Sequence, residues 1–156
     1  MASRTKTLAA AIVTAIQAFS GLPSGVDCRV VRNVRHLVSA LPEDVTATIA
    51  VMCSEVEDES GRGEVQDLAT IGVCIMANVD SDSVTATDTW DELTEQLRDH
   101  FRTSAALKSV TVATGVSAAR MKVETPVVCD ADVLDQDEVF ISVTTLQYRI
   151  SVGNRS

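Results

Sequence analysis

The feature that most constrains the fold is a long apolar run followed by an amphipathic segment, within residues 66–102. The run at 68–79 is rich in β-branched residues, which predicts a strand. The next segment carries four large apolar residues at spacings of 3, 4 and 4, namely Trp90, Leu93, Leu97 and Phe101. This spacing places all four on one helical face. Because such a face must be buried, the pattern favours a helix packed on a sheet.

The length and composition favour one folded domain spanning residues 1–156. Hydrophobic residues make up 46% of the chain and aromatic residues only 3%, so the core must be built mainly from aliphatic side chains. No segment reaches the roughly 20 apolar residues of a membrane helix, so we expect no membrane partner.

The remaining elements follow from periodicity and turn residues. A helix is predicted at 5–19, with Thr5 or Thr7 as its cap and an apolar stripe of Leu8, Ile12, Ala15, Ile16 and Phe19. Strands are predicted at 28–34, 44–57, 68–79, 109–113, 118–126 and 138–152. The apolar residues of 28–41 also fit a helical stripe. A strand at 28–34 followed by irregular chain is the favoured interpretation of this segment, and a helix is the alternative.

These elements predict an α+β fold. The sheet is expected to be largely antiparallel or mixed, with a long hairpin, packed by an N-terminal helix and a second central helix. The hairpin is expected to join the strands at 44–57 and 68–79 through an acidic loop at 55–64. Its long strands could extend a neighbour's sheet by edge pairing.

The net charge of −9 is unevenly distributed. Residues 1–40 carry +4 and residues 41–156 carry −13, and an acidic body argues against wrapping DNA. Candidate interface or lumen residues are the charged groups of the loop, Glu55, Glu57, Asp58, Glu59, Arg62 and Glu64, and the early arginines, Arg29, Arg32 and Arg35. The acidic stretch at 129–138 is a further lumen candidate.

The sequence offers no catalytic, cofactor-binding or metal-binding constellation. The stretch Asp130–Asp137 resembles a calcium loop, but Asp135 stands where a glycine is needed and Ile141 where the final glutamate is needed. Asp80 and Asp82 have no third carboxylate at a fixed spacing. The two histidines, His36 and His100, stand alone, and His100 is expected at the surface. The four cysteines are expected to be reduced: Cys28, Cys53, Cys74 and Cys129.

The order of elements resembles that of the tail terminator (tail-completion, neck) proteins of long-tailed bacteriophages. The resemblance lies in the segments 41–51, 69–77 and 83–101 and in the alternating final strand at 139–150. It implies a non-enzymatic virion protein that forms a homo-hexameric ring, caps the tail tube and joins the tail to the head.

The implied partners are further copies of the chain, the tail tube protein and a head-closure or connector protein, with genomic DNA only as passing cargo. No cofactor is implied. The protein would assemble in the host cytoplasm and reside in the virion neck. A head-closure or adaptor neck protein is the nearest alternative, and a small α+β metal-dependent enzyme is the alternative from another class.

Overall fold

The computed structural model describes residues 3–23, 25–30, 47–58, 64–79, 87–127 and 139–154. Its helices are α1 (Arg4–Gln17), α3 (Asp88–Thr103) and α4 (Ala105–Lys108). Its strands are β1 (Val26–Val30), β2 (Ala47–Asp58), β3 (Glu64–Asn78), β4 (Ser109–Ala113), β5 (Val116–Val127) and β6 (Val139–Asn154). The fold is therefore α+β, as the sequence predicted.

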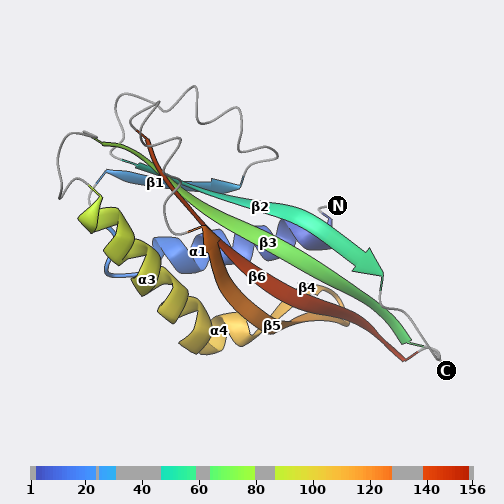
Figure 1. Ribbon diagram of the computed structural model, residues 1–156. Helices are drawn as coiled ribbons and strands as arrows, with labels where there is room; N and C mark the ends of the chain where they lie inside the picture. The colour runs from blue at the N-terminus through green and yellow to red at the C-terminus, as the bar shows by residue number, and fades with distance from the viewer. Residues whose placement is uncertain are drawn as a thin grey trace.

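The strands form one mixed sheet in the order β1-β2-β3-β6-β5-β4. β1 runs parallel to β2, and every other neighbouring pair is antiparallel. The helices lie on the same side of the sheet, where α1 contacts β1, β2 and β4 while α3 contacts β3, β5 and β6 (Figure 1). The sheet therefore has one helix-covered face and one face without a described helix.

The predicted apolar stripe is fully buried in α3 and partly buried in α1. On α3, Trp90, Leu93, Leu97 and Phe101 are all buried. On α1, Leu8, Ile12 and Ile16 are fully buried, and Ala9, which the predicted stripe omitted, is buried with them. The predicted Ala15 and Phe19 are only partly buried, and Phe19 lies beyond the end of the helix. These side chains and the inward residues of the strands form the main core.

Two buried hydrogen bonds fasten the helical layer to β6. The phenol oxygen of Tyr148 donates to the carbonyl oxygen of Leu107 in α4 at 2.7 Å. The hydroxyls of Thr94 in α3 and Ser142 in β6 lie 2.8 Å apart, and Thr94 also donates to the carbonyl of Trp90 at 2.8 Å. Since every hydroxyl in these contacts is buried, both bonds also satisfy groups that cannot reach water.

The predicted cap of the first helix was wrong. The N-cap residue is Ser3, whose hydroxyl accepts a hydrogen bond from the backbone N–H of Lys6 at 3.2 Å. Thr7, one of the two predicted caps, is inside the helix and donates from its side chain to the carbonyl of Ser3. The helix begins at Arg4, one residue before the predicted start. It can begin there because the Ser3 hydroxyl accepts a hydrogen bond from a backbone N–H group of the first turn.

The interpretation of 55–64 as a loop was wrong for part of its length. Glu55, Glu57 and Asp58 belong to β2, and Glu64 is the first residue of β3. Past a bulge at Cys53/Glu55, the backbone of β2 continues to pair with β3. The carboxylate side chains of this stretch are exposed to solvent while its main chain remains part of the sheet. Residues 59–63 lie outside the described part of the chain.

The first strand is β1 at Val26–Val30, which overlaps the predicted strand at 28–34 but begins earlier. The rest of that ambiguous segment lies outside the described residues. The strand at Ser109–Ala113 has the predicted bounds, and Gly115 turns the chain into β5 with a φ of 71°. That backbone conformation favours glycine, since a side chain would strain it.

Candidate interaction surface

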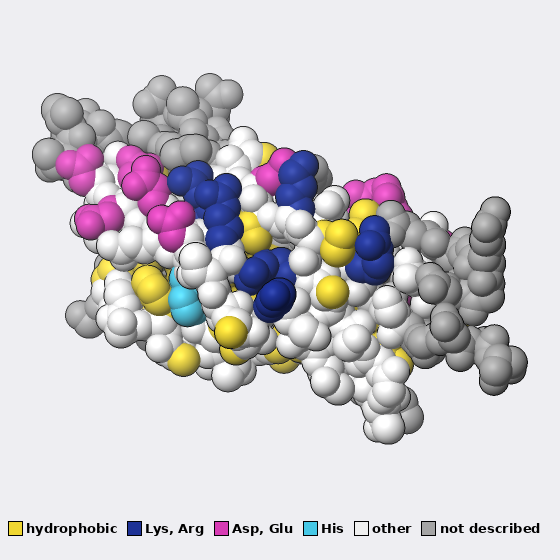
Figure 2. Space-filling view, turned by 90° about the horizontal axis from the view of Figure 1, so that it is seen from below, with side chains coloured by type: hydrophobic (Ala, Val, Ile, Leu, Met, Phe, Trp, Pro, Cys, Tyr) yellow, Lys and Arg dark blue, Asp and Glu magenta, His cyan; other side chains and the backbone are white. Residues whose placement is uncertain are grey.

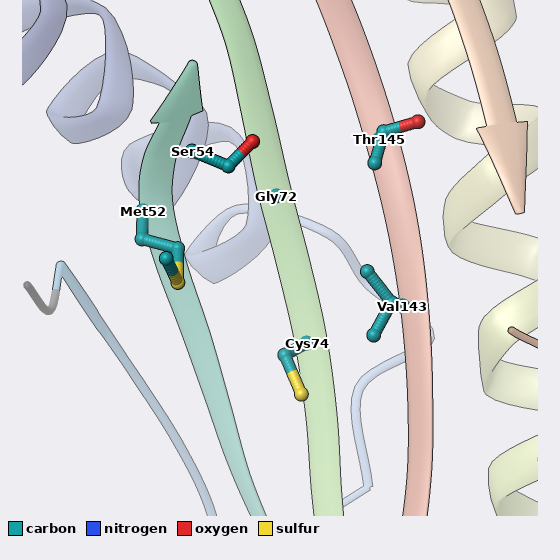
Figure 3. A pocket seen from close by; sticks show the side chains of 6 residues that line it. All are labelled: Met52, Ser54, Gly72, Cys74, Val143 and Thr145. Carbon is teal, nitrogen blue, oxygen red and sulfur yellow. The ribbon is translucent and has the colours of Figure 1, made fainter. Parts of the chain in front are cut away.

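The face of the sheet opposite the helices carries a shallow apolar hollow of about 210 Å³ (Figure 3). It is lined by residues of the three central strands: Met52, Ser54, Gly72, Cys74, Val143 and Thr145. Met52 and Thr145 both pair with Gly72, one from each side. Because Gly72 has no side chain, the hollow opens between these two neighbours. An alanine Cβ at this position would lie 3.7 Å from Cγ of Met52, which is ordinary contact.

A second apolar cluster continues from the hollow along the same face. Its buried members are Ala50, Cys74, Met76 and Val139, with Ile141 and Val143 packed against them. Thr48, which pairs with Met76 on this face, is fully buried, and its hydroxyl has no hydrogen-bond partner among the described residues. These residues are buried within the subunit, so the accessible apolar surface on this face is the hollow around Gly72.

The three cysteines in the described part of the chain are free thiols, as expected. Burial raises the pKa of Cys74 to about 12, and burial together with the nearby Asp27 raises the pKa of Cys28 to about 12. Burial also raises the pKa of Cys53. A thiol must ionise to act as a nucleophile, so none of these three has the electrostatic setting of a reactive cysteine. Cys129 lies outside the described residues.

The acidic candidates are placed at the far end of the sheet from the second apolar cluster. Glu55, Glu57 and Asp58 are exposed on β2, opposite Thr70, Leu68 and Asp67 of β3. Glu64 pairs through its backbone with Asn154 at the end of β6. Glu59 and Arg62 lie outside the described residues. Glu55 and Glu57 therefore share one face of the sheet, while Asp58 lies on the other face.

The early arginines are only partly placed. Arg29 is on β1, where its Nε lies 3.2 Å from a carboxylate oxygen of Asp27. Arg32 and Arg35 lie outside the described residues, as does the acidic stretch at 129–138. Since Arg29 and Asp27 neutralise each other at an exposed position, this end of the sheet carries little net charge from the pair.

The face of the molecule seen from below carries a group of acidic side chains at one end and lysines and arginines across the middle, with further acidic side chains among and beyond these bases (Figure 2). The first half of α3 contributes Asp88, Asp91, Glu92 and Glu95. Burial raises the pKa of Asp91, and the neighbouring Asp88 and then Glu95 raise it further. Part of this distribution follows from the helix itself, because acids are favoured near a helix N-terminus.

Two basic residues of β5, Arg120 and Lys122, were not singled out by the sequence analysis. They lie on opposite faces of the sheet, because Arg120 pairs with the buried Tyr148 and Lys122 pairs with the adjacent Gln147. Arg120 donates from one terminal nitrogen to the carbonyls of Phe101 and Ser104, the latter at 3.2 Å, which ties the end of α3 to β5. Lys122 forms an ion pair with Glu124 at 2.6 Å. Both bases are therefore held by partners within the subunit.

Metal and histidine chemistry receive no support from the described residues. No group of three or more histidine, cysteine, aspartate or glutamate side chains there could hold a metal ion. The aspartates at 80 and 82 and those of 130–137 are outside the described ranges, as is His36. His100 is half-buried, not fully at the surface, because its ring lies against Phe19 at a centroid distance of 5.0 Å.

None of the described helices combines the length and apolar character needed to cross a membrane. A scan against models of protein families found no match to this chain. A search of curated proteins also found none.

Proposed function

We propose that this protein is a structural virion protein that ends a bacteriophage tail tube as a ring and joins the tail to the head. The observation that carries the proposal is the projecting sheet formed by β2, β3 and β6, whose ends reach away from α3 and α4 (Figure 1). These strands have 12, 15 and 16 residues, which is far longer than an average strand.

A projecting sheet of this kind is suited to contact with other proteins. Its exposed side chains include Glu55, Val56 and Glu57, and it has no described helix over either side at this end. Few-stranded sheets are only marginally stable without a packed face, so neighbouring subunits would stabilise this part of the chain. The apolar hollow around Gly72 adds a second contact surface on the open face of the same strands.

In this proposal the long β2–β3 hairpin, packed by α1 and by the central helix α3, is the assembly arm of a hexameric subunit. The partners are further copies, the tail tube protein and a head-closure or connector protein. DNA passes through the ring without being bound tightly, because the net charge of −9 disfavours contact with phosphates. The function is structural and requires no catalytic step and no cofactor. The protein assembles in the host cytoplasm and stays in the virion neck.

The test is electron microscopy of the purified protein, alone and mixed with tail tubes. We expect rings that sit on one end of each tube, and tubes that stop growing when the protein is present. Rings that bind a head connector but not a tail tube would favour the head-closure alternative. A protein that stays monomeric, caps no tube and copurifies with no neck component would contradict the proposal, as would tight binding to DNA at physiological salt.

A further inference from the structure

Two strands of the sheet continue beyond the neighbour that covers their outer side. β1 pairs with β2 only over residues 47–51, so residues 52–58 of β2 have no described strand on their outer side (Figure 1). β4 pairs with β5 only over residues 116–119, so residues 120–127 of β5 likewise have no described outer neighbour. We call these two stretches the open edges of β2 and β5. Such an edge is a template on which a strand of another chain can pair.

Each open edge also carries a large apolar side chain that is exposed to solvent. Val56 on β2 is 49% exposed, and Met121 on β5 is 48% exposed. Exposed apolar side chains beside unpaired backbone groups favour aggregation through strand edges. The two open edges are therefore places where unwanted pairing between copies is favoured.

The open edge of β2 is interrupted by a bulge. Cys53 pairs with Ile71 and Glu55 pairs with Thr70, so Ser54 is an extra residue on β2. The hydroxyl of Ser54 donates a hydrogen bond to the carbonyl oxygen of Thr70 at 3.1 Å, which stabilises the bulge. A bulge bends its strand and increases the local twist, so the backbone groups of this edge no longer form the regular row that an added strand needs.

The open edge of β5 begins with a bulge of the same kind. Arg120 pairs with Tyr148 and Lys122 pairs with Gln147, so Met121 is the extra residue. The exposed apolar side chain of this edge therefore stands on the bulge itself. The ladder between β5 and β6 is irregular at the position where an added strand would have to contact Met121.

Further along the same edge are two more features that disfavour an added strand. A second irregularity lies between Glu124 and Val127, and Pro126 is within it. Proline has no backbone N–H group, so Pro126 cannot donate a hydrogen bond to an added strand. Lys122 and Glu124 are exposed on this edge strand and form an ion pair at 2.6 Å, which places charge where an added strand would lie.

The irregularities of β2 and β5 coincide with the open edges. Pairing with the inner strands is regular where an outer strand covers β2 or β5, over residues 47–51 and 117–119. All the register shifts between β2 and β3, and between β5 and β6, lie in the open edges. This placement is what protection of an unpaired edge requires.

We propose that the bulges at Ser54 and Met121, together with Pro126, protect the open edges of β2 and β5 against strand pairing between copies. Contacts between copies then use other surfaces of the subunit, and the sheet does not continue from one copy to the next through these edges. The inference does not rest on the proposed function, and neither ring formation nor the capping of tail tubes enters its test.

The test removes the two extra residues one at a time. Deletion of Ser54 makes the pairs on either side of the bulge consecutive, so the ladder becomes regular with its existing partners, and deletion of Met121 does the same in β5. We expect both deletion variants to fold, as judged by circular dichroism and urea denaturation. In sedimentation velocity at equal concentration, both should shift to larger species than the wild type, and both should bind more thioflavin T.

The matched controls change the side chain and keep the extra residue: Ser54→Ala and Met121→Ser. Both are expected to sediment like the wild type. The comparison at Met121 is the sharper one, because its deletion removes an exposed apolar side chain. Lower hydrophobicity alone would reduce association, whereas loss of the bulge is expected to increase it. Equal association in the deletion variant and in Met121→Ser would contradict the inference.

Hydrogen exchange locates the new contact. In the associated deletion variants, backbone amides of the repaired edge, within residues 52–58 or 120–127, should exchange more slowly than in the wild type. Folded deletion variants that associate no more than the wild type would overturn the inference, as would slower exchange confined to other regions. Deletion variants that do not fold would show that the bulges are required for packing within the subunit, which also overturns it.

Discussion

The phenol oxygen of Tyr148 donates a hydrogen bond to the carbonyl oxygen of Leu107 at 2.7 Å, across 41 residues of sequence. Both side chains are buried, so neither group can exchange its partner for water. The contact joins the centre of β6 to the short helix α4, from which the chain enters β4. It therefore fixes the position of β4 and β5 relative to the rest of the sheet.

Replacing Tyr148 with phenylalanine removes this hydrogen bond while keeping the ring. The carbonyl of Leu107 then loses its partner inside the core, so we expect the free energy of unfolding to fall by about 1–3 kcal/mol. Urea denaturation of the wild type and the variant measures the difference. The matched control is Thr103→Val at the exposed end of α3, which removes a bond from Thr103 to the carbonyl of Asp99. Equal losses in both variants would contradict a special role for Tyr148.

The same tyrosine predicts a loss of stability in alkali. Burial raises the pKa of Tyr148 from 10.0 to about 12, since the charged phenolate is disfavoured there. The unfolded chain therefore releases this proton at a lower pH than the folded chain does. The contribution is fully present below pH 10 and is lost as the pH rises towards about 12. The free energy of unfolding should fall less steeply with pH across this range in Tyr148→Phe than in the wild type. Equal slopes in the two proteins would contradict the prediction.

Trp90 is predicted to anchor α3 on the sheet. Its side chain is only 6% exposed and heads the buried stripe of the helix. Truncation to alanine should lower the free energy of unfolding by about 3–5 kcal/mol through lost contacts and a cavity. Thr89→Ala, at the exposed neighbouring position, is the control and should change stability little. An unchanged melting temperature in Trp90→Ala would rule out the anchor.

The hydroxyl pair between α3 and β6 predicts that removing Thr94 or Ser142 costs different amounts of stability. Each hydroxyl has one proton, and Thr94 uses its own for the carbonyl of Trp90, so Ser142 must donate to Thr94. Thr94→Val leaves the buried Ser142 and the Trp90 carbonyl without this partner, while Ser142→Ala leaves the bond from Thr94 to Trp90 intact. We expect Thr94→Val to cost about 1 kcal/mol more. Thermal melts of both variants test this, and the reverse order would refute the donor assignment.

The cysteines should differ in their reactivity towards a thiol reagent. Cys53 is half-buried, whereas Cys28 and Cys74 are 8% and 3% exposed with pKa values raised to about 12. In a Cys129→Ser background, native protein should be labelled first at Cys53, and at the other two only after unfolding. Mass spectrometry after timed labelling identifies the sites. Labelling of Cys74 as fast as Cys53 would contradict its burial, and a disulfide between any two would contradict the reduced state.

The sequence by itself determined the elements whose signals are local. The stripe of Trp90, Leu93, Leu97 and Phe101 required a helix with one buried face, and that face is buried. The strand at Ser109–Ala113 and the turn at Gly115 also followed from neighbouring residues alone. Periodicity and turn chemistry are properties of a few adjacent positions, which is why they can be read without knowing what each element contacts.

The tertiary structure decided which strands are neighbours and which charges meet. The run from Glu55 to Asp58 has a composition typical of a loop, yet pairing with β3 keeps its backbone in the ladder. β2 and β3 were expected to offer their edges to a neighbour, but both are interior strands, and only the end of β2 extends past β1. Strand order depends on contacts between distant segments, so no local pattern could have specified it. The contact of Arg120 with the carbonyls of Phe101 and Ser104 exists for the same reason, because folding alone brings β5 beside the end of α3.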